Sequence, residues 1–426
     1  MKATTESGIG APWWRRLGAG LITGAADDDP SGVATYSQVG ARFGFGLLWI
    51  VFVTIPLMIA IQMVSARVGR VTGRSLADNL MRTFPAPLVW TLVASLVVAN
   101  VINIGADLAA MGAAAQLLIG GPSVAYAIGF AMLSTALQVY LSFDRYAPIL
   151  KVLAVSLLAY VGTLFVVHVP WGEALKATVL PPIQWKADYL TAIVAVLGTT
   201  ISPYLFSWQA AQEVEELRQV NEREPLRSAV KQGPDALRRI AMDTTVGMVI
   251  SNVIAFCIIL TAAAVLHAHG KTDIQSSSDA AEALKPLAGP LAFGLFAAGI
   301  VSTGLLAVPV LAGATAFAVA GAAQAPYGLD HRPAKAKLFY GVLVGSMLLG
   351  AALTLSPIDP IKALYWSAVV NGVCAVPLMA AIMWVARQHR TMGEFTVRGA
   401  LWAWGWAATA VMGVAAIVMF ATLGKG

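Results

Sequence analysis

The sequence predicts an all-α, polytopic membrane protein whose chain crosses the bilayer eleven times. Hydrophobic residues make up 58% of the chain and charged residues only 12%, whereas about 25% of a soluble domain is charged. Apolar stretches recur along the whole length, each long enough to cross a hydrocarbon core of about 30 Å as a helix. Helix-breaking residues interrupt the first and sixth of these stretches, which indicates two inverted halves of five spans plus one further span.

The predicted spans occupy nearly the whole chain. In order they cover residues 17–41, 45–66, 86–116, 121–141, 146–168, 187–208, 241–267, 287–323, 336–356, 360–386 and 398–423. We expect one transmembrane domain over residues 1–426. Within it, 17–168 forms the first five-helix repeat, 187–386 the second, inverted repeat, and 398–423 the additional helix.

The distribution of positive charge predicts the orientation in the membrane. If the N-terminus is cytoplasmic, 21 of the 28 Lys and Arg residues lie in the N-terminal tail, in loops after even-numbered spans or near the adjoining span ends. Short cytoplasmic loops are rich in Lys and Arg, so we expect a cytoplasmic N-terminus and an extracytoplasmic C-terminus. Topology then explains the net charge of +6 without a nucleic-acid partner. We expect an integral protein of a bacterial inner membrane, with no cleavable signal peptide.

The longest polar stretch, 212–240, contains Glu213, Glu215, Glu216 and several basic residues. Its composition is typical of a cytoplasmic amphipathic helix with a connector, and we expect it to be mainly solvated. The two cysteines, Cys257 and Cys374, both lie in apolar stretches. They lack the spacing of a disulfide framework or a zinc site, so we expect them only to pack.

The breaks in the first and sixth spans are Pro30-Ser31-Gly32 and Ser202-Pro203. Proline lacks the amide that would bond one turn back, so the helix must stop or kink there. Backbone groups freed in lipid are tolerated where they line a cavity or find new partners. Two paired breaks at the start of inverted halves are typical of secondary transporters that hold an ion or substrate at mid-membrane. The simpler alternative is two ordinary proline kinks.

Three carboxylates, Asp27, Asp28 and Asp29, lead into the first break. An ionisable group at that depth is costly and is a functional candidate for that reason. Neighbouring helical residues point about 100° apart, so we expect Asp29 at the site and Asp27 and Asp28 facing water or another helix. The stretch from Gly198 to Tyr204 could add hydroxyl and carbonyl oxygens from the sixth span. Oxygen ligands suit magnesium, calcium and manganese, so we expect a divalent metal cation as substrate.

At these residues the chain resembles the natural resistance-associated macrophage protein (NRAMP) family of divalent-metal transporters. Residues 29–45, which begin Asp-Pro-Ser-Gly, are similar to the family's first-span motif, which begins Asp-Pro-Gly-Asn. The loop 67–77 is a second match, and 198–204 is similar to the family's Gly-Ala-Thr-Val-Met-Pro-His. The resemblance covers nearly the whole chain and implies a LeuT-like fold, with the metal as substrate and no cofactor.

The chain departs from the family at the implied metal ligands. Asp29 is kept, but Gly32 replaces a liganding Asn and Ser202 replaces a Met whose sulfur favours transition metals. Thr199 replaces an Ala that offers its carbonyl, and Tyr204 replaces a His. We expect the changes at Gly32 and Ser202 to enlarge the site and suit a partly hydrated magnesium ion, as in the family's divergent magnesium-transporting branch. The proline after Asp29 makes the match to that branch imperfect, so manganese remains an alternative substrate.

The resemblance also bears on proton coupling. Asp107 matches one of two acidic residues that serve the family's proton path, but the second is Ala110 here, and Gln209 replaces a histidine of the sixth span. Asp107 could instead pair internally with a polar residue such as Asn103. Asn371 lies near a metal-facing polar position of the tenth span, or could make an interhelical hydrogen bond. We therefore expect weak or absent coupling, with a proton-coupled manganese and iron transporter as the alternative.

Two further function classes fit the sequence less well. A membrane enzyme using metal-assisted chemistry usually needs further carboxylates at helical spacing, and none follows Asp29 within its span. A sodium-coupled transporter of an organic solute needs a free helix N-terminus for the solute's carboxylate, and Asp29 would repel that group. The sequence carries no signal for the oligomeric state.

Overall fold

The computed structural model describes residues 19–141, 158–219, 223–274, 277–282, 289 and 292–423, and within these ranges it contains helices and no strands. The helices of the first half are α1 (Ala19–Asp27), α2 (Pro30–Phe43), η2 (Gly44–Leu47), α3 (Leu48–Thr72), α4 (Leu76–Met81), α5 (Ala86–Ile119), α6 (Ser123–Tyr140), α8 (Leu158–Thr163) and α9 (Trp171–Val179). Those of the second half are α10 (Ala187–Thr200), α11 (Pro203–Gln219), η4 (Val230–Gln232), α12 (Gly233–Val265), η5 (His267–His269), α13 (Ser277–Glu282), α15 (Ala292–Ala322), α16 (Lys337–Leu353) and α17 (Pro360–Arg387). The chain closes with α18 (His389–Met392), η7 (Gly393–Phe395) and α19 (Gly399–Leu423).

The helices agree with the predicted spans except at the fifth, where α8 ends at Thr163, five residues before the predicted limit of 168. Eight helical stretches among the described residues are long and apolar enough to cross a membrane, and α16 is a shorter apolar helix at the predicted ninth span. The predicted fifth span, 146–168, lies mostly outside the described residues. The prediction of an all-α polytopic membrane protein is therefore confirmed, while the limits of the two repeats stay a prediction.

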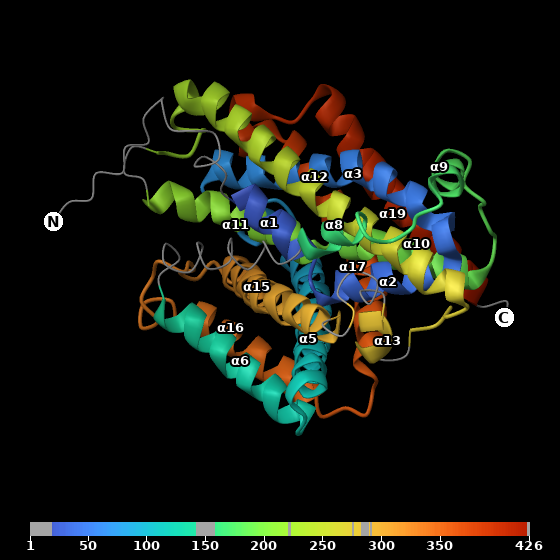
Figure 1. Cartoon of the computed structure of the whole chain (residues 1–426). Helices are drawn as coiled ribbons and strands as arrows, with labels where there is room; N and C mark the ends of the chain where they lie inside the picture. Colours follow the sequence, from blue (N-terminus) through green and yellow to red (C-terminus); the bar gives the residue numbers. More distant parts are fainter. Residues whose placement is uncertain are drawn as a thin grey trace.

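Helix α5 runs through the middle of the molecule (Figure 1) and contacts α6, α15, α16 and α17. On the other side of the molecule, α12 packs against α1, α2 and α3, and α19 packs against α3, α10 and α17. The broken pairs α1–α2 and α10–α11 lie between these two groups, since α1 contacts α12, α11 and α15, and α10 contacts α17 and α2. This arrangement encloses both breaks within the helix bundle.

Both predicted breaks are present, and the local sequence explains their limits. Helix α1 ends at Asp27, and α2 begins at Pro30 with Asp29 as its N-cap in extended conformation. Proline at the first helical position needs no amide partner, and an aspartate is among the preferred N-caps. Helix α10 ends at Thr200 and α11 begins at Pro203, again with proline first. The two interruptions are therefore true helix ends and not kinks.

Glycine fixes the local geometry at two positions, one beside the second break and one at the end of α3. A Cβ atom at Gly198 would lie 2.0 Å from the carbonyl oxygen of Ala368, so only glycine lets α10 approach α17 this closely. Gly73 ends α3 in the left-handed conformation, with φ 66°, and its amide bonds to the Gly69 carbonyl. Because L side chains rarely adopt that conformation, glycine suits this turn.

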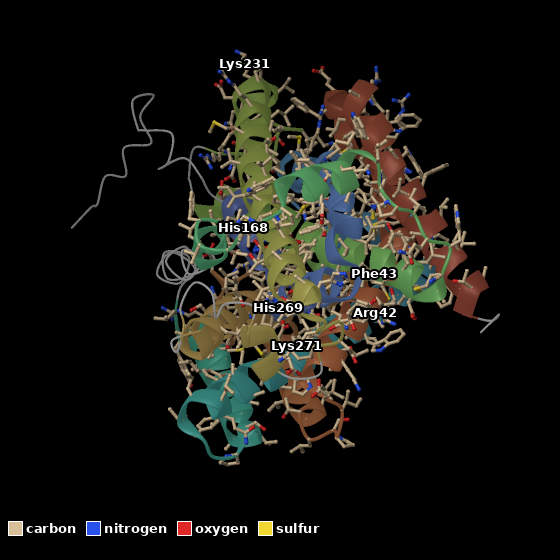
Figure 2. All side chains as sticks on the ribbon, turned by 45° about the vertical axis from the view of Figure 1, so that its right-hand side comes forward. Arg42, Phe43, His168, Lys231, His269 and Lys271 are labelled. Carbon is tan, nitrogen blue, oxygen red and sulfur yellow. The ribbon has the colours of Figure 1, made fainter. Side chains whose placement is uncertain are left out.

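The polar stretch 212–240 differs from the prediction. Helix α11 continues through it to Gln219, and the side chains of Glu213 and Glu215 are buried. The expectation of a mainly solvated segment is therefore wrong for residues 212–217, where these carboxylates pack among basic residues, while most of residues 223–240 are exposed or half-buried. Figure 2 shows Lys231 beyond one end of α12 and His269 and Lys271 beyond the other. Cys257 is buried, Cys374 is half-buried, and both are free thiols, as predicted.

Candidate metal site

Asp29 lies at the junction of three helices. Its side chain is buried, and its Oδ1 accepts a hydrogen bond from the backbone amide of Gly32 at 2.6 Å, which caps α2. Its Oδ2 lies 2.9 Å from Asn103 Nδ2 of α5 and 3.3 Å from the Tyr204 hydroxyl of α11. A single carboxylate therefore links the two broken spans to the central helix.

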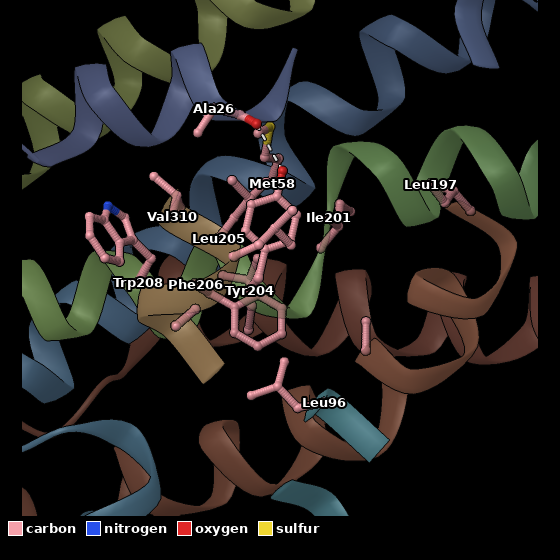
Figure 3. Packing of buried hydrophobic residues seen from close by; sticks show 14 of the residues in the cluster. Ala26, Met58, Leu96, Leu197, Ile201, Tyr204, Leu205, Phe206, Trp208 and Val310 are labelled. Carbon is pink, nitrogen blue, oxygen red and sulfur yellow. Dashed lines mark hydrogen bonds between the residues drawn. The ribbon is translucent and has the colours of Figure 1, made fainter. Parts of the chain in front are cut away.

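The Tyr204 hydroxyl contacts the backbone and the side chain at the first break. The hydroxyl lies 2.8 Å from the carbonyl oxygen of Ala26, in the last turn of α1, as well as near Asp29, and its one proton can serve either acceptor. Figure 3 shows the ring enclosed by apolar side chains, among them Leu205 and Phe206. A freed carbonyl in the membrane must find a donor, and Tyr204 supplies one.

Ser202 occupies the second break without projecting a free hydroxyl. Its Oγ lies 2.5 Å from the Gly198 carbonyl oxygen and 2.8 Å from that of Thr199, so it closes the last turn of α10 on itself. Both residues expected as ligands, Thr199 and Ser202, are buried. The Thr199 carbonyl and the Ser202 hydroxyl are thus both engaged in local hydrogen bonds at the break.

Gly32 does not enlarge the site, contrary to expectation. A Cβ atom at Gly32 would lie 3.0 Å from the Asp27 carbonyl oxygen, 3.3 Å from Thr199 Oγ1 and 3.4 Å from the Tyr36 ring. The space is filled because the two breaks approach each other closely here. The prediction that both substitutions open the site is therefore wrong at Gly32.

Asp107 belongs to the same polar cluster as Asp29. Asn103 Nδ2, one turn earlier on α5, lies 3.5 Å from Asp107 Oδ2 and 2.9 Å from Asp29 Oδ2. The Asn103 Oδ1 accepts a hydrogen bond from the Ser367 hydroxyl of α17 at 2.7 Å. Asp107 Oδ1 is buried and has no hydrogen-bond partner in the described part of the chain. The predicted internal pairing of Asp107 with Asn103 is present, and it reaches Asp29.

Asp27 and Asp28 precede Asp29 in the chain, and both are buried. Asp27 accepts a hydrogen bond from the Ser251 hydroxyl of α12. It therefore faces another helix, which is one of the two placements that we expected. Asp28 is fully buried, and neither of its carboxylate oxygens has a hydrogen-bond partner in the described ranges. Asp28 is therefore shielded from bulk solvent, and nothing in the described structure explains a carboxyl group at this position.

The two remaining predicted residues are Gln209 on α11 and Asn371 on α17. Gln209 Nε2 donates to Thr244 Oγ1 of α12 at 2.6 Å, so this side chain binds α12. Asn371 is buried on α17, one turn beyond Ser367, and its Oδ1 has no hydrogen-bond partner among the residues described. Its buried, unpartnered oxygen is the kind of group that a cation could use, since such groups normally have partners.

The buried carboxylates of the site lack positively charged partners in the described structure. Over the described ranges, no Lys or Arg side chain forms an ion pair with Asp27, Asp28, Asp29 or Asp107. The same ranges contain no cluster of three or more His, Cys, Asp or Glu side chains that could hold a metal. The site thus offers two carboxylates and neutral oxygens, a set that suits hard cations.

Three contributors to this cluster escaped the sequence-based assignment of site residues: Asn103 as a partner of Asp29, Ser367 on α17, and Ser251 beside Asp27. The signal for Asn103 was its position four residues before Asp107, which places both side chains on one face of a helix. No comparable signal exists for Ser367 and Ser251, because their role depends on how α17 and α12 pack.

Comparisons with known proteins agree with this architecture. Residues 20–422 match the family model described as natural resistance-associated macrophage protein-like. A divalent metal cation transporter MntH of Verminephrobacter eiseniae is 26% identical over 392 residues, which cover 89% of this chain and 83% of that protein. The crystal structure of a manganese transporter of Eremococcus coleocola is 16% identical, with a TM-score of 0.76 over 99% of this chain and 89% of that one. The structure of MhsT in complex with L-phenylalanine is 14% identical, with a TM-score of 0.60 over 96% and 98% of the two chains. These likenesses to solved structures show the fold, and the expected LeuT-like architecture is confirmed.

Proposed function

The chain belongs to the natural resistance-associated macrophage protein-like family, and from this premise we propose that it carries a divalent metal cation, magnesium or manganese, across the membrane by alternating access. One observation carries the proposal: the buried Asp29 carboxylate stands at a helix break with no cationic side chain paired to it in the described structure. A buried charge needs a counter-charge, and a divalent cation from solution supplies it. The family consists of transporters, so the chain is not an enzyme, and the metal is its substrate and not a cofactor.

The donor set supports a hard cation. Asp29, Asp107, Asn103 and the freed carbonyls of the breaks all offer oxygen, and Ser202 stands where the family resemblance implies a sulfur ligand. Few direct protein ligands favour an ion that keeps part of its water shell, which is typical of magnesium. The name of the Verminephrobacter relative gives divalent metals without choosing one, and the Eremococcus structure is of a manganese transporter.

Proton coupling is proposed to be weak or absent. Ala110 lies buried where the resemblance implies a second acidic residue, and Gln209 makes a neutral hydrogen bond with Thr244. The alternative is a proton-coupled manganese and iron transporter, and Asp107 is the residue that favours it.

A sodium-coupled transporter of an organic solute is less compatible with the geometry. The N-terminus of α2 is already capped by the chain's own Asp29 carboxylate, which accepts from the Gly32 amide. A solute carboxylate directed to that helix end would meet a negative charge at short range.

The orientation is part of the proposal. The asymmetry of Lys and Arg supports a cytoplasmic N-terminus and an extracytoplasmic C-terminus in a bacterial inner membrane. We expect a C-terminal alkaline phosphatase fusion to be active and a C-terminal green fluorescent protein fusion to stay dark. The opposite result would overturn the orientation and leave the cation site untouched.

Uptake into proteoliposomes tests the function directly. Magnesium, manganese and calcium should be compared side by side at equal concentration, with a pH-sensitive dye inside the vesicles. We expect magnesium or manganese uptake with little change in internal pH. Uptake of none of the three, at a confirmed level of reconstituted protein, would overturn the proposal, and acidification in step with manganese uptake would favour the proton-coupled alternative.

A further inference from the structure

The Asn103 side chain occupies the space between two buried carboxylates. Its Nδ2 lies 2.9 Å from Asp29 Oδ2 and 3.5 Å from Asp107 Oδ2. The amide group carries two hydrogens and a partial positive charge, while an ionised carboxylate only accepts. In this arrangement the amide hydrogens stand where a shared cation would have to stand.

The environment of Asn103 Oδ1 permits the amide to turn over. Ser367 Oγ lies 2.7 Å from Asn103 Oδ1 and also 2.7 Å from the Leu364 carbonyl oxygen. A hydroxyl has one proton and can also accept, so Ser367 donates to one of these oxygens at a time. If the amide reverses, Ser367 can donate to Leu364 and accept from Asn103 Nδ2. Both orientations of Asn103 are therefore satisfied by the same hydroxyl.

We propose that binding of a divalent cation reverses the Asn103 amide, so that its Oδ1 becomes a ligand together with the carboxylates of Asp29 and Asp107. The inference rests on the proposed function and adds α5 to the cation site. The reversal is required by charge, because an amide NH₂ facing a cation is repulsive while an amide oxygen is a good ligand for a hard ion. Two carboxylates and one divalent cation form a neutral set, which lowers the cost of burying all three.

The opposite role for Asn103 gives an opposite experimental result. If Asn103 only satisfies Asp29 in the ion-free chain, it competes with the cation, and its removal should leave cation affinity unchanged or increase it. If Asn103 becomes a ligand, its removal should decrease affinity. The direction of the change therefore decides between the two.

The chain offers a matched control on the same helix. Asn100 is also buried on α5, but its Nδ2 donates to Thr315 Oγ1 of α15 at 2.9 Å and does not contact Asp29. Asn103→Leu and Asn100→Leu remove the same chemical group from neighbouring turns of one helix. Effects on packing should appear in both variants, and effects on ligation only in the first.

The test is calorimetric titration of the purified full chain with manganese and, separately, with magnesium. We expect Asn103→Leu to weaken binding by about tenfold or more, the size of one charge-assisted polar interaction, and Asn100→Leu to change it by less than about twofold. Binding in Asn103→Leu that equals or exceeds that of the wild type would overturn the inference.

Two further variants keep the test decisive. Asp107→Asn conserves size, so if Asn103→Leu does not fold, this variant serves instead: we expect about tenfold weaker binding, and unchanged binding would overturn the shared site. Asp29→Ala tests the proposed function itself. If the wild type binds and Asp29→Ala does not, while Asn103→Leu and Asp107→Asn bind normally, only the inference about α5 fails.

Discussion

Buried carboxylates occur in two regions of this protein, and the two regions treat them differently. At the end of α11, Glu213 lies 2.5 Å from Arg239, and Glu216 lies 3.0 Å from both Arg239 and Arg223. Glu215 is 3.4 Å from Arg218. At the break of the first span, the carboxylates have no ion-pair partner in the described structure, although they are as buried as Glu213 and Glu215.

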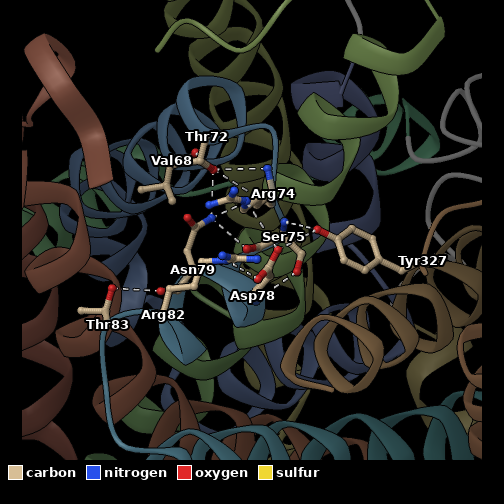
Figure 4. A network of polar contacts seen from close by, with 9 residues as sticks. All are labelled: Val68, Thr72, Arg74, Ser75, Asp78, Asn79, Arg82, Thr83 and Tyr327. Atoms are coloured by element: carbon tan, nitrogen blue, oxygen red, sulfur yellow. Dashed lines mark hydrogen bonds and ion pairs between the residues drawn. The ribbon is translucent and has the colours of Figure 1, made fainter. Parts of the chain in front are cut away.

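The difference distinguishes carboxylates that stabilise the fold from carboxylates that are available to bind a cation. Where the protein supplies its own guanidinium groups, the buried carboxylates are neutralised and hold helices together. Where it supplies none, the positive charge must come from outside, because an unpaired buried charge is costly. Helix α4 repeats the first pattern: Asp78 accepts a hydrogen bond from Arg82 at 2.8 Å, and Figure 4 shows Tyr327 and Asn79 in the same network.

The largest expected effect separates Asp29 from a paired carboxylate. We expect Asp29→Ala to reduce cation binding by more than about a hundredfold, because it removes the charged ligand at the break. Glu216→Gln is the control, since it changes a paired carboxylate on α11 and should leave affinity nearly unchanged. The measurement is the Kd for manganese of folded, detergent-purified protein. Wild-type transport by a well-folded Asp29→Ala variant would remove the distinction between the regions.

The second effect is on stability. Arg239→Met leaves Glu213 buried without its partner, and breaking a buried pair in this way costs about 3–5 kcal/mol. We expect a clear decrease in the thermal unfolding midpoint, with the Kd for manganese of the remaining folded protein unchanged. Adding Glu213→Leu in the same chain should recover much of the loss. An unchanged midpoint in the single variant would show that this ion pair does not hold the helices together.

The sequence predicts most of the fold because membrane spans and helix breaks are local properties. Apolar length defines the helices, and Pro30 and Pro203 define the two interruptions at the residues where the structure has them. Asp29 could be identified for the same reason, as a carboxylate beside a break. Each of these signals is contained in a few consecutive residues.

The remainder of the site depends on packing between distant segments. The expectation of open space at Gly32 was wrong because Asp27, Thr199 and Tyr36 close around it, and these contacts cross from one break to the other. The burial of Glu213 could not be predicted for a similar reason, since its partner Arg239 lies on α12. The composition of a charged stretch predicts solvent exposure, and only the positions of its ion-pair partners show that it is buried.

The smallest expected effect concerns metal preference at the second break. The Ser202 hydroxyl bonds to carbonyls of its own helix, at 2.5 Å from Gly198 and 2.8 Å from Thr199, so it offers little to an ion. Ser202→Met places a soft thioether beside the site, and we expect preference to shift toward manganese and cadmium over magnesium by about 1 kcal/mol, or fivefold to tenfold. Ser202→Leu is the matched control, because it has similar bulk without sulfur and should show no such shift.

The single substitution is a cleaner test than a combination with Gly32→Asn, since the side chain at residue 32 would meet Asp27, Thr199 and Tyr36 and disturb both breaks at once. Competition between the metals in proteoliposome uptake gives the ranking directly. An equal shift in the methionine and leucine variants would mean that size, and not sulfur, sets selectivity at this break.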